Sequence, residues 1–156
     1  IGTTPEIVAR CLLNHRNLRI VTNNLNVAAA AAANPTFEVT IAGGRVRNDD
    51  LDVLGDSAEQ LFASYKVDIG IFGVAGVDND GTLLDFYEDE VRTRLAILNN
   101  CRSSILVLDH TKFTRTAHVR GGFIGRVDQI FCEQKPLRHI LAYLADAKTE
   151  LVICSE

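Results

Sequence analysis

Residues 67–74 read Val-Asp-Ile-Gly-Ile-Phe-Gly-Val, a nearly continuous apolar run. Such a run favours a strand that is covered on both faces, as in a parallel sheet. Gly70 and Gly73 within it indicate a close approach of a helix or another backbone. This strand therefore predicts a layered α/β domain.

Similar short runs alternate with helical segments along the chain. Strands are predicted at 18–22, 37–42, 67–74, 104–108, 127–132 and 151–154, and helices at 5–14, 25–33, 58–65, 86–100 and 137–147. Residues 45–54 and 114–122 show no clear period and are predicted as loops. Alternation of this kind predicts an α/β fold with a mostly parallel sheet and helices on both faces.

Helix boundaries and charge spacing add detail to this pattern. Asn24 is a candidate cap for the helix at 25–33, and Asp56-Ser57 for the helix at 58–65. In the helix at 86–100, the spacing of Glu88 with Arg92, and of Glu90 with Arg94, predicts ion pairs between successive turns.

Composition limits the classes of protein. The chain has 156 residues, 47% of them hydrophobic, and a net charge of −4. One domain is expected, and its overall field does not favour nucleic acid. No apolar run reaches the length of a membrane span.

The cysteines and histidines give no sign of a metal or disulfide framework. The four cysteines are isolated in or beside apolar runs, so we expect buried, reduced thiols and a cytoplasmic protein. The four histidines are scattered, without metal-ligand spacing. We therefore expect no metal, no cofactor and no catalytic residue set.

The first six residues, Ile-Gly-Thr-Thr-Pro-Glu, predict a glycine-containing turn that leads into a helix. Thr4 is a candidate N-cap, and Pro5 suits the first turn. The unpaired N–H groups of a helix start bind anions, phosphate above all. Gly2 would allow a close approach, and the hydroxyls of Thr3 and Thr4 would add donors. The alternative is an ordinary helix start.

Further polar turns follow other strands. In parallel sheets, ligands bind outside the carboxyl ends of the strands, where all these turns would meet. Hydroxyls, amides, carboxylates and cations together suit a small phosphorylated sugar or polyol. The side chains expected there are Thr3, Thr4, Asn23, Asn24, Asp78, Glu90, Arg94, Asp109 and Lys112.

Several of these residues have structural alternatives. Asn23 and Asn24 could only cap a helix, and Asp78 could only shape its turn. Glu90 and Arg94 could be an exposed helix pair. Lys112, shortly after a buried strand, is better placed as a point charge for phosphate.

Six segments in order resemble the effector-binding domain of DeoR-family bacterial repressors. They are residues 1–4, 21–24, 42–44, 76–81, 90–94 and 109–113. The resemblance implies the fold of ribose-5-phosphate isomerase, a phosphorylated inducer such as sn-glycerol 3-phosphate, and a dimer or tetramer. By position, it implies effector contacts from Gly2, Thr3, Thr4, Asn23, Asn24, Gly76, Asp78, Glu90, Arg94 and Lys112.

The resemblance also bears on the extent of the protein. Residues 1–156 would form the effector-binding domain, and operator DNA would be bound through an N-terminal helix-turn-helix domain that this chain lacks. Because the chain begins within a turn, we expect a part of a longer protein.

Two other functions remain open from the sequence. A sugar-phosphate aldose–ketose isomerase would need a carboxylate base, from Asp78, Glu88 or Glu90, and an electrophile such as Lys112. A pure oligomerisation module would keep the pocket without a ligand.

Overall fold

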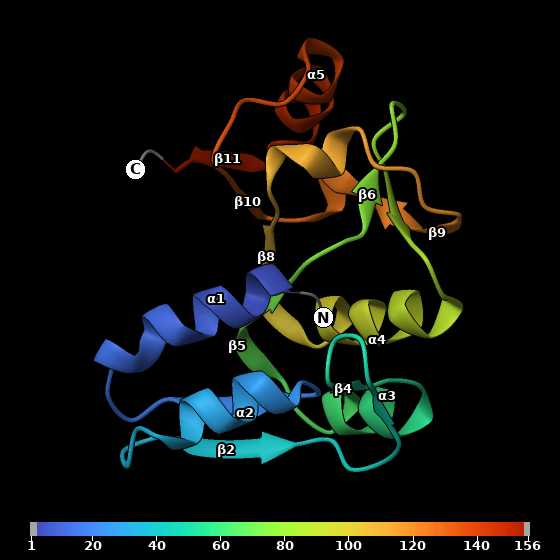
Figure 1. Ribbon diagram of the computed structural model, residues 1–156. Coiled ribbons are helices and arrows are strands. Elements are labelled where there is room, and N and C mark those ends of the chain that lie inside the picture. Colours follow the sequence, from blue (N-terminus) through green and yellow to red (C-terminus); the bar gives the residue numbers. More distant parts are fainter. Residues whose placement is uncertain (1–2, 155–156) are drawn as a thin grey trace.

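A four-stranded parallel sheet forms the centre of the computed structural model, which describes residues 3–154 (Figure 1). Its order is β11-β10-β8-β5, and a separate parallel pair joins β1 to β2. The strands are β1 (Arg19–Thr22), β2 (Glu38–Ile41), β5 (Val67–Phe72), β8 (Cys101–Val107), β10 (Gln129–Cys132) and β11 (Glu150–Ile153). The predicted α/β architecture is confirmed.

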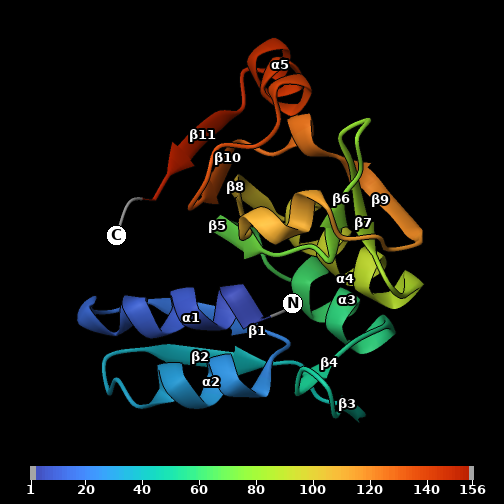
Figure 2. The same cartoon turned by 45° about the horizontal axis from the view of Figure 1, so that its top comes forward.

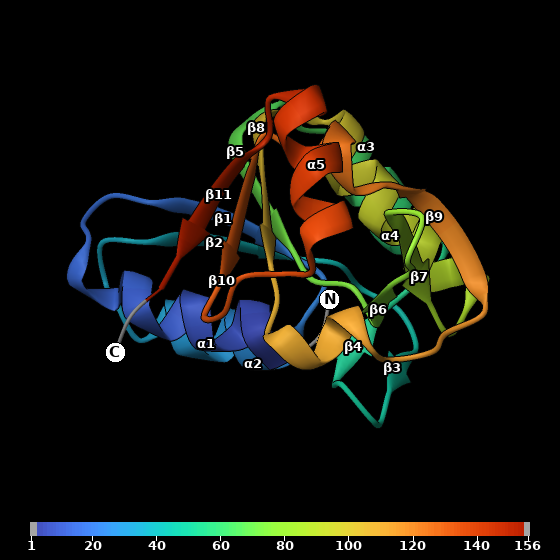
Figure 3. The same cartoon turned by 90° about the horizontal axis from the view of Figure 1, so that it is seen from above.

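Helices flank the strands: α4 and α5 lie on one side and α1 on the other (Figure 3). The helices are α1 (Thr3–Cys11), α2 (Leu25–Ala32), α3 (Asp56–Ala63), α4 (Glu88–Asn99) and α5 (Arg138–Ala147). Short 3-10 turns are η1 (Leu12–Asn14), η2 (His110–Phe113) and η3 (Ile124–Arg126). None of the helices within residues 3–154 is long and apolar enough to cross a membrane.

The core lies between the four-stranded sheet and the helices of the α4 side. Phe72, Leu106 and Ile130, from three neighbouring strands, are fully buried there. A Cβ on Gly70 would stand 2.8 Å from Cys101 Sγ and 3.1 Å from Ile97 on α4. The close approach predicted at this glycine is confirmed. The opposite face is less complete, because Ile69 on β5 is 56% exposed. The prediction that this strand is covered on both faces is therefore wrong.

Short antiparallel strands lie in the two segments that were predicted as loops, and also within residues 76–85, where no strand was predicted. A hairpin joins β3 (Val46–Arg47) to β4 (Asp52–Val53). A three-stranded sheet of β6 (Gly76–Val77), β7 (Thr82–Asp85) and β9 (Val119–Phe123) lies beside α4 (Figure 2). Strands of two residues are too short to show an alternating pattern, so most of these strands could not be predicted.

Some local predictions at helix starts hold and others fail. Asn24 caps α2, since its Oδ1 accepts the Val27 N–H at 2.9 Å. The cap predicted at Asp56-Ser57 is wrong, because α3 starts at Asp56 and Gly55 is the cap, with φ 79°. Thr4 is likewise not a cap, because α1 already includes Thr3.

All four cysteines are free, as predicted. Cys101 and Cys132 are buried, whereas Cys11 and Cys154 are exposed, so the prediction that all four are buried was wrong. Burial raises the pKa of the Cys132 thiol to about 11, which keeps it protonated near neutral pH.

Candidate functional site

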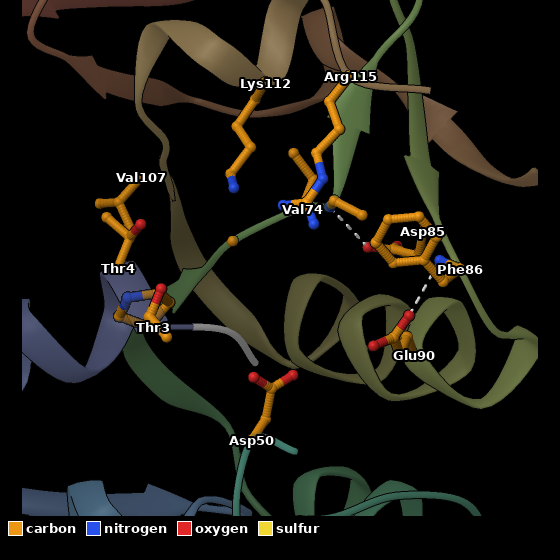
Figure 4. A pocket seen from close by; sticks show the side chains of 13 residues that line it. Thr3, Thr4, Asp50, Val74, Asp85, Phe86, Glu90, Val107, Lys112 and Arg115 are labelled. Atoms are coloured by element: carbon orange, nitrogen blue, oxygen red, sulfur yellow. Dashed lines mark hydrogen bonds between the residues drawn. The ribbon is translucent and has the colours of Figure 1, made fainter. Parts of the chain in front are cut away.

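A cavity of about 280 Å³ lies at the carboxyl ends of β5 and β8, where the start of α1 meets η2 and the start of α4 (Figure 4). Its position is the sheet edge that the sequence predicted for a ligand. It is lined by Thr3, Thr4, Pro5, Asp50, Gly73, Val74, Ala75, Asp85, Phe86, Glu90, Val107, Lys112 and Arg115. Four of the predicted site residues are among these, namely Thr3, Thr4, Glu90 and Lys112. Gly2 lies outside the described residues.

Lys112 brings a positive charge to this cavity. It lies on η2, which Asp109 caps by accepting the Thr111 N–H at 2.9 Å. The Lys112 side chain is 17% exposed, and its Nζ lies 3.6 Å from Asp109 Oδ2. Burial alone would raise the pKa of Asp109, but the Thr111 hydrogen bonds and Lys112 outweigh it and hold this pKa below its usual value. In Figure 4 the Lys112 amine points into the cavity towards the start of α1.

A contact between Glu133 and His110 holds η2 against the sheet. The carboxylate of Glu133, directly after β10, accepts the His110 N–H at 3.0 Å and contacts the His110 ring at Nδ1. The His110 backbone and ring together lower the pKa of Glu133 from 4.5 to about 2. Glu133 thus stays ionised and holds the turn that carries Lys112.

Asp85, one of the carboxylates that line the cavity, is paired with a buried arginine. Asp85 Oδ2 accepts Arg94 Nη2 and Nε at 2.8 and 3.0 Å, and Arg94 is fully buried. Arg94 Nη1 also donates to Gly121 O at 2.9 Å. Because the donors of Arg94 bond inside the protein, Arg94 does not line the cavity.

Glu90 is bound by α4 and by the β3–β4 hairpin. Its Oε2 accepts the N–H groups of Phe86 and Tyr87, at 3.0 and 3.1 Å, which caps the helix. Its Oε1 accepts Arg47 Nη1 at 2.6 Å. The predicted pairing of Glu90 with Arg94 is therefore wrong: each residue has a partner from another part of the chain.

The predicted pairing of Glu88 with Arg92 is wrong in the same way. Arg92 instead contacts Asp56, Glu59 and Asp89, at 2.7, 3.0 and 3.5 Å.

Asn23 and Asn24 do not line the cavity; they hold the hairpin beside it. Asn23 Nδ2 donates to Val53 O at 2.9 Å, and Asn24 Nδ2 donates to Asp50 O at 2.9 Å. Both asparagines are almost completely buried. Their side chains thus place Asp50, which does line the cavity.

Gly76 and Asp78 also lie outside the cavity lining. A Cβ on Gly76 would stand 2.4 Å from Arg115 O, so glycine lets the Arg115 segment pass close to β6. Asp78 is exposed in the turn before β7, and its Oδ1 accepts the Asn79 N–H at 2.8 Å. This is the turn-shaping role that the sequence left open for Asp78.

A second cavity of about 420 Å³ adjoins the first. Both are lined by Asp50, Phe86, Glu90 and Arg115. The Arg115 guanidinium lies 5.1 Å from the centroid of the Phe86 ring, a cation–π contact between the two cavities.

Within residues 3–154, His, Cys, Asp and Glu form no group of three that could hold a metal ion.

Comparison with known proteins identifies the family. Residues 1–134 match the sequence profile described as DeoR C terminal sensor domain. The chain belongs to this family. The resemblance found in the six sequence segments is thereby confirmed.

Several relatives of this sensor domain have names. It is 44% identical over 154 residues to the glycerol-3-phosphate regulon repressor of Escherichia coli (strain K12), covering 99% of this chain and 61% of that protein. The repressor of the same name from Haemophilus influenzae is 43% identical over 155 residues, with 99% and 60% covered. The HTH-type transcriptional repressor CsqR of E. coli is 36% identical, with 100% and 60% covered.

The sensor domain thus spans about three fifths of the length of these relatives. All three are named as repressors, which gives the isomerase alternative no support.

Sequence reasoning missed three cavity residues of the sensor domain. Asp50 lies in a segment without periodicity, Asp85 ends a strand of a hairpin that was not predicted, and Arg115 lies in a segment predicted as irregular. Only the short spacing between Lys112 and Arg115 could have suggested that both cations belong to one site.

Proposed function

We propose that this sensor domain binds a small phosphorylated polyol and thereby controls DNA binding by the longer protein. The first candidate is sn-glycerol 3-phosphate, because two relatives that are more than 40% identical are named after its regulon. The observation that carries the proposal is the juxtaposition of Lys112 with Thr3 and Thr4 across one cavity. A helix start and an ammonium group are complementary to a phosphate.

The charge balance of the cavity supports an anionic ligand. Asp85 is paired with Arg94, and Asp50 and Glu90 are both paired with Arg47. Arg94 thus neutralises Asp85, whereas Arg47, which Asp52 also contacts, offsets part of the charge of Asp50 and Glu90 and so reduces the repulsion that a phosphate would meet. Lys112 and Arg115 then add positive charge at the cavity wall.

Control of DNA binding requires that the ligand favour one conformation over another. The proposed ligand would contact α1, η2 and the β3–β4 hairpin together, and would draw them closer. We propose that this closure alters the arrangement of subunits in a cytoplasmic dimer or tetramer. A separate N-terminal helix-turn-helix domain would contact the operator, and the sensor domain itself would perform no catalysis.

Isothermal titration calorimetry with sn-glycerol 3-phosphate tests the binding step. Lys112→Ala should weaken binding roughly tenfold or more, because hydrogen bonds to charged groups contribute about 1.5–3 kcal/mol. Lys135→Ala is the matched control, since Lys135 is exposed and does not line the cavity. Equal affinities of wild type and Lys112→Ala would refute the phosphate position, and no binding of any phosphorylated polyol would refute the proposal.

A further inference from the structure

We propose that Asp50 determines effector specificity. Its carboxylate accepts a hydroxyl hydrogen from the polyol end of the ligand and disfavours ligands with a second anionic group there. This inference rests on the proposed function, because it places the phosphate near Lys112 and the rest of the ligand towards Asp50. In Figure 4 the Asp50 carboxylate points into the cavity from the side opposite Lys112.

The position of Asp50 is fixed by its backbone. Its carbonyl oxygen accepts Asn24 Nδ2 at 2.9 Å, and the next carbonyl, that of Leu51, accepts the Leu25 N–H at 2.8 Å. The side chain of Asp50 remains 30% exposed. The start of α2 thus holds the hairpin so that one carboxylate faces the cavity.

Among the cavity carboxylates, Asp50 has the most accepting capacity left. Both oxygens of Asp85 accept hydrogen bonds within the protein, from Arg94 and from the Ala75 N–H at 3.1 Å. Both oxygens of Glu90 do so as well. Asp50 Oδ2 accepts Arg47 Nη2 at 2.8 Å, but no hydrogen bond from residues 3–154 reaches its Oδ1. A hydroxyl of the ligand would satisfy this oxygen.

The same arrangement would exclude a second anionic group. Arg47 already donates four hydrogen bonds, to Asp50, Asp52 and Glu90. Only one of its five N–H groups is then left to neutralise an added charge. A ligand carboxylate next to Asp50 would meet a like charge at close range, whereas a hydroxyl brings its own hydrogen.

Two ligands that differ in one group can test whether the site prefers a hydroxyl or an anionic group beside Asp50. sn-Glycerol 3-phosphate and L-3-phosphoglycerate share the phosphate and the neighbouring hydroxyl in the same configuration, but the second carries a carboxylate in place of the terminal CH₂OH. We expect the wild type to bind glycerol 3-phosphate at least tenfold more tightly. Asp50→Asn should reduce the ratio of the two affinities severalfold, because an amide can donate to the ligand carboxylate and carries no charge.

Asp49→Asn is the matched control, because it removes the same charge from the adjacent residue, which lines the second cavity but not the first, where the ligand is placed. It should keep the wild-type preference. If Asp50→Asn keeps that preference too, or if Asp49→Asn narrows it equally, the role of Asp50 is refuted while the proposed function stands. If neither probe binds the wild type, and other phosphorylated polyols do not bind either, both the role of Asp50 and the proposed function are refuted.

Discussion

Replacing the fully buried Arg94 by methionine should destabilise the domain strongly. Arg94 is fully buried and Asp85 is 2% exposed. The substitution removes both hydrogen bonds to Asp85 Oδ2 and the one to Gly121 O. Stranding a buried charge in this way costs about 3–5 kcal/mol. Domains of this size are stable by about 5–15 kcal/mol, so the loss is a large fraction of the total.

Urea denaturation followed by circular dichroism would measure this loss. Arg92→Met is the matched control on the same helix, because the Arg92 side chain is 50% exposed although it contacts three carboxylates. We expect only a small change for Arg92→Met, since water screens exposed pairs. The double variant Arg94→Met with Asp85→Leu should recover much of the loss, because no unpaired charge remains.

The opposite outcome would restore the interpretation of Arg94 as a ligand contact. If Arg94→Met left the midpoint of denaturation unchanged but abolished effector binding, the burial argument would be refuted. Equal losses for Arg92→Met and Arg94→Met would also refute it, because burial would then not decide the strength of these pairs.

Three further changes test other parts of the site. Asn24→Ala should cost about 1–2 kcal/mol, because it removes a helix cap and the bond to Asp50 O; unchanged denaturation would contradict this. Gly76→Ala should cost about 1–3 kcal/mol, since its Cβ would stand 2.4 Å from Arg115 O, and a wild-type melting temperature would refute the close packing. The lowered pKa of Glu133 means that its contribution is present above about pH 4.5 and is lost as the pH falls towards 2. Between pH 5 and pH 3, the melting temperature of Glu133→Gln should therefore fall by less than that of the wild type. An equal fall in melting temperature for the two proteins would contradict this.

Features that depend mainly on neighbouring residues in the sequence could be predicted. The apolar and β-branched runs predicted all six strands of the two parallel sheets, because such side chains favour strands. The helix cap at Asn24 was also found, whereas the caps predicted at Thr4 and at Asp56-Ser57 by the same reasoning were wrong. The location of the cavity followed from the parallel order of the strands.

The elements that depend on distant neighbours could not be predicted. The spacing of Arg94 offered Glu90 as a partner, but Asp85 is buried beside it and takes the pair. Arg47 contacts Glu90, a residue 43 positions away, and no periodicity reveals such a contact. The three-stranded sheet was missed for the same reason, because its strands are short and their pairing is decided by the packing on α4.

Hydrogen-bonding capacity separates residues that can contact a ligand from those that support the site. In Asn24, Oδ1 is engaged by Val27 and Nδ2 by Asp50, and the donors of Arg94 bond to Asp85 and Gly121. Neither side chain can turn to a ligand without breaking its own buried bonds, which costs more than an exposed contact returns. Among residues 3–154, the contact of the Lys112 ammonium with a carboxylate is the one to Asp109 at 3.6 Å, so its donors can still bind a phosphate. Substituting Asn24 would therefore weaken ligand binding together with domain stability, whereas substituting Lys112 would weaken binding and leave stability nearly unchanged.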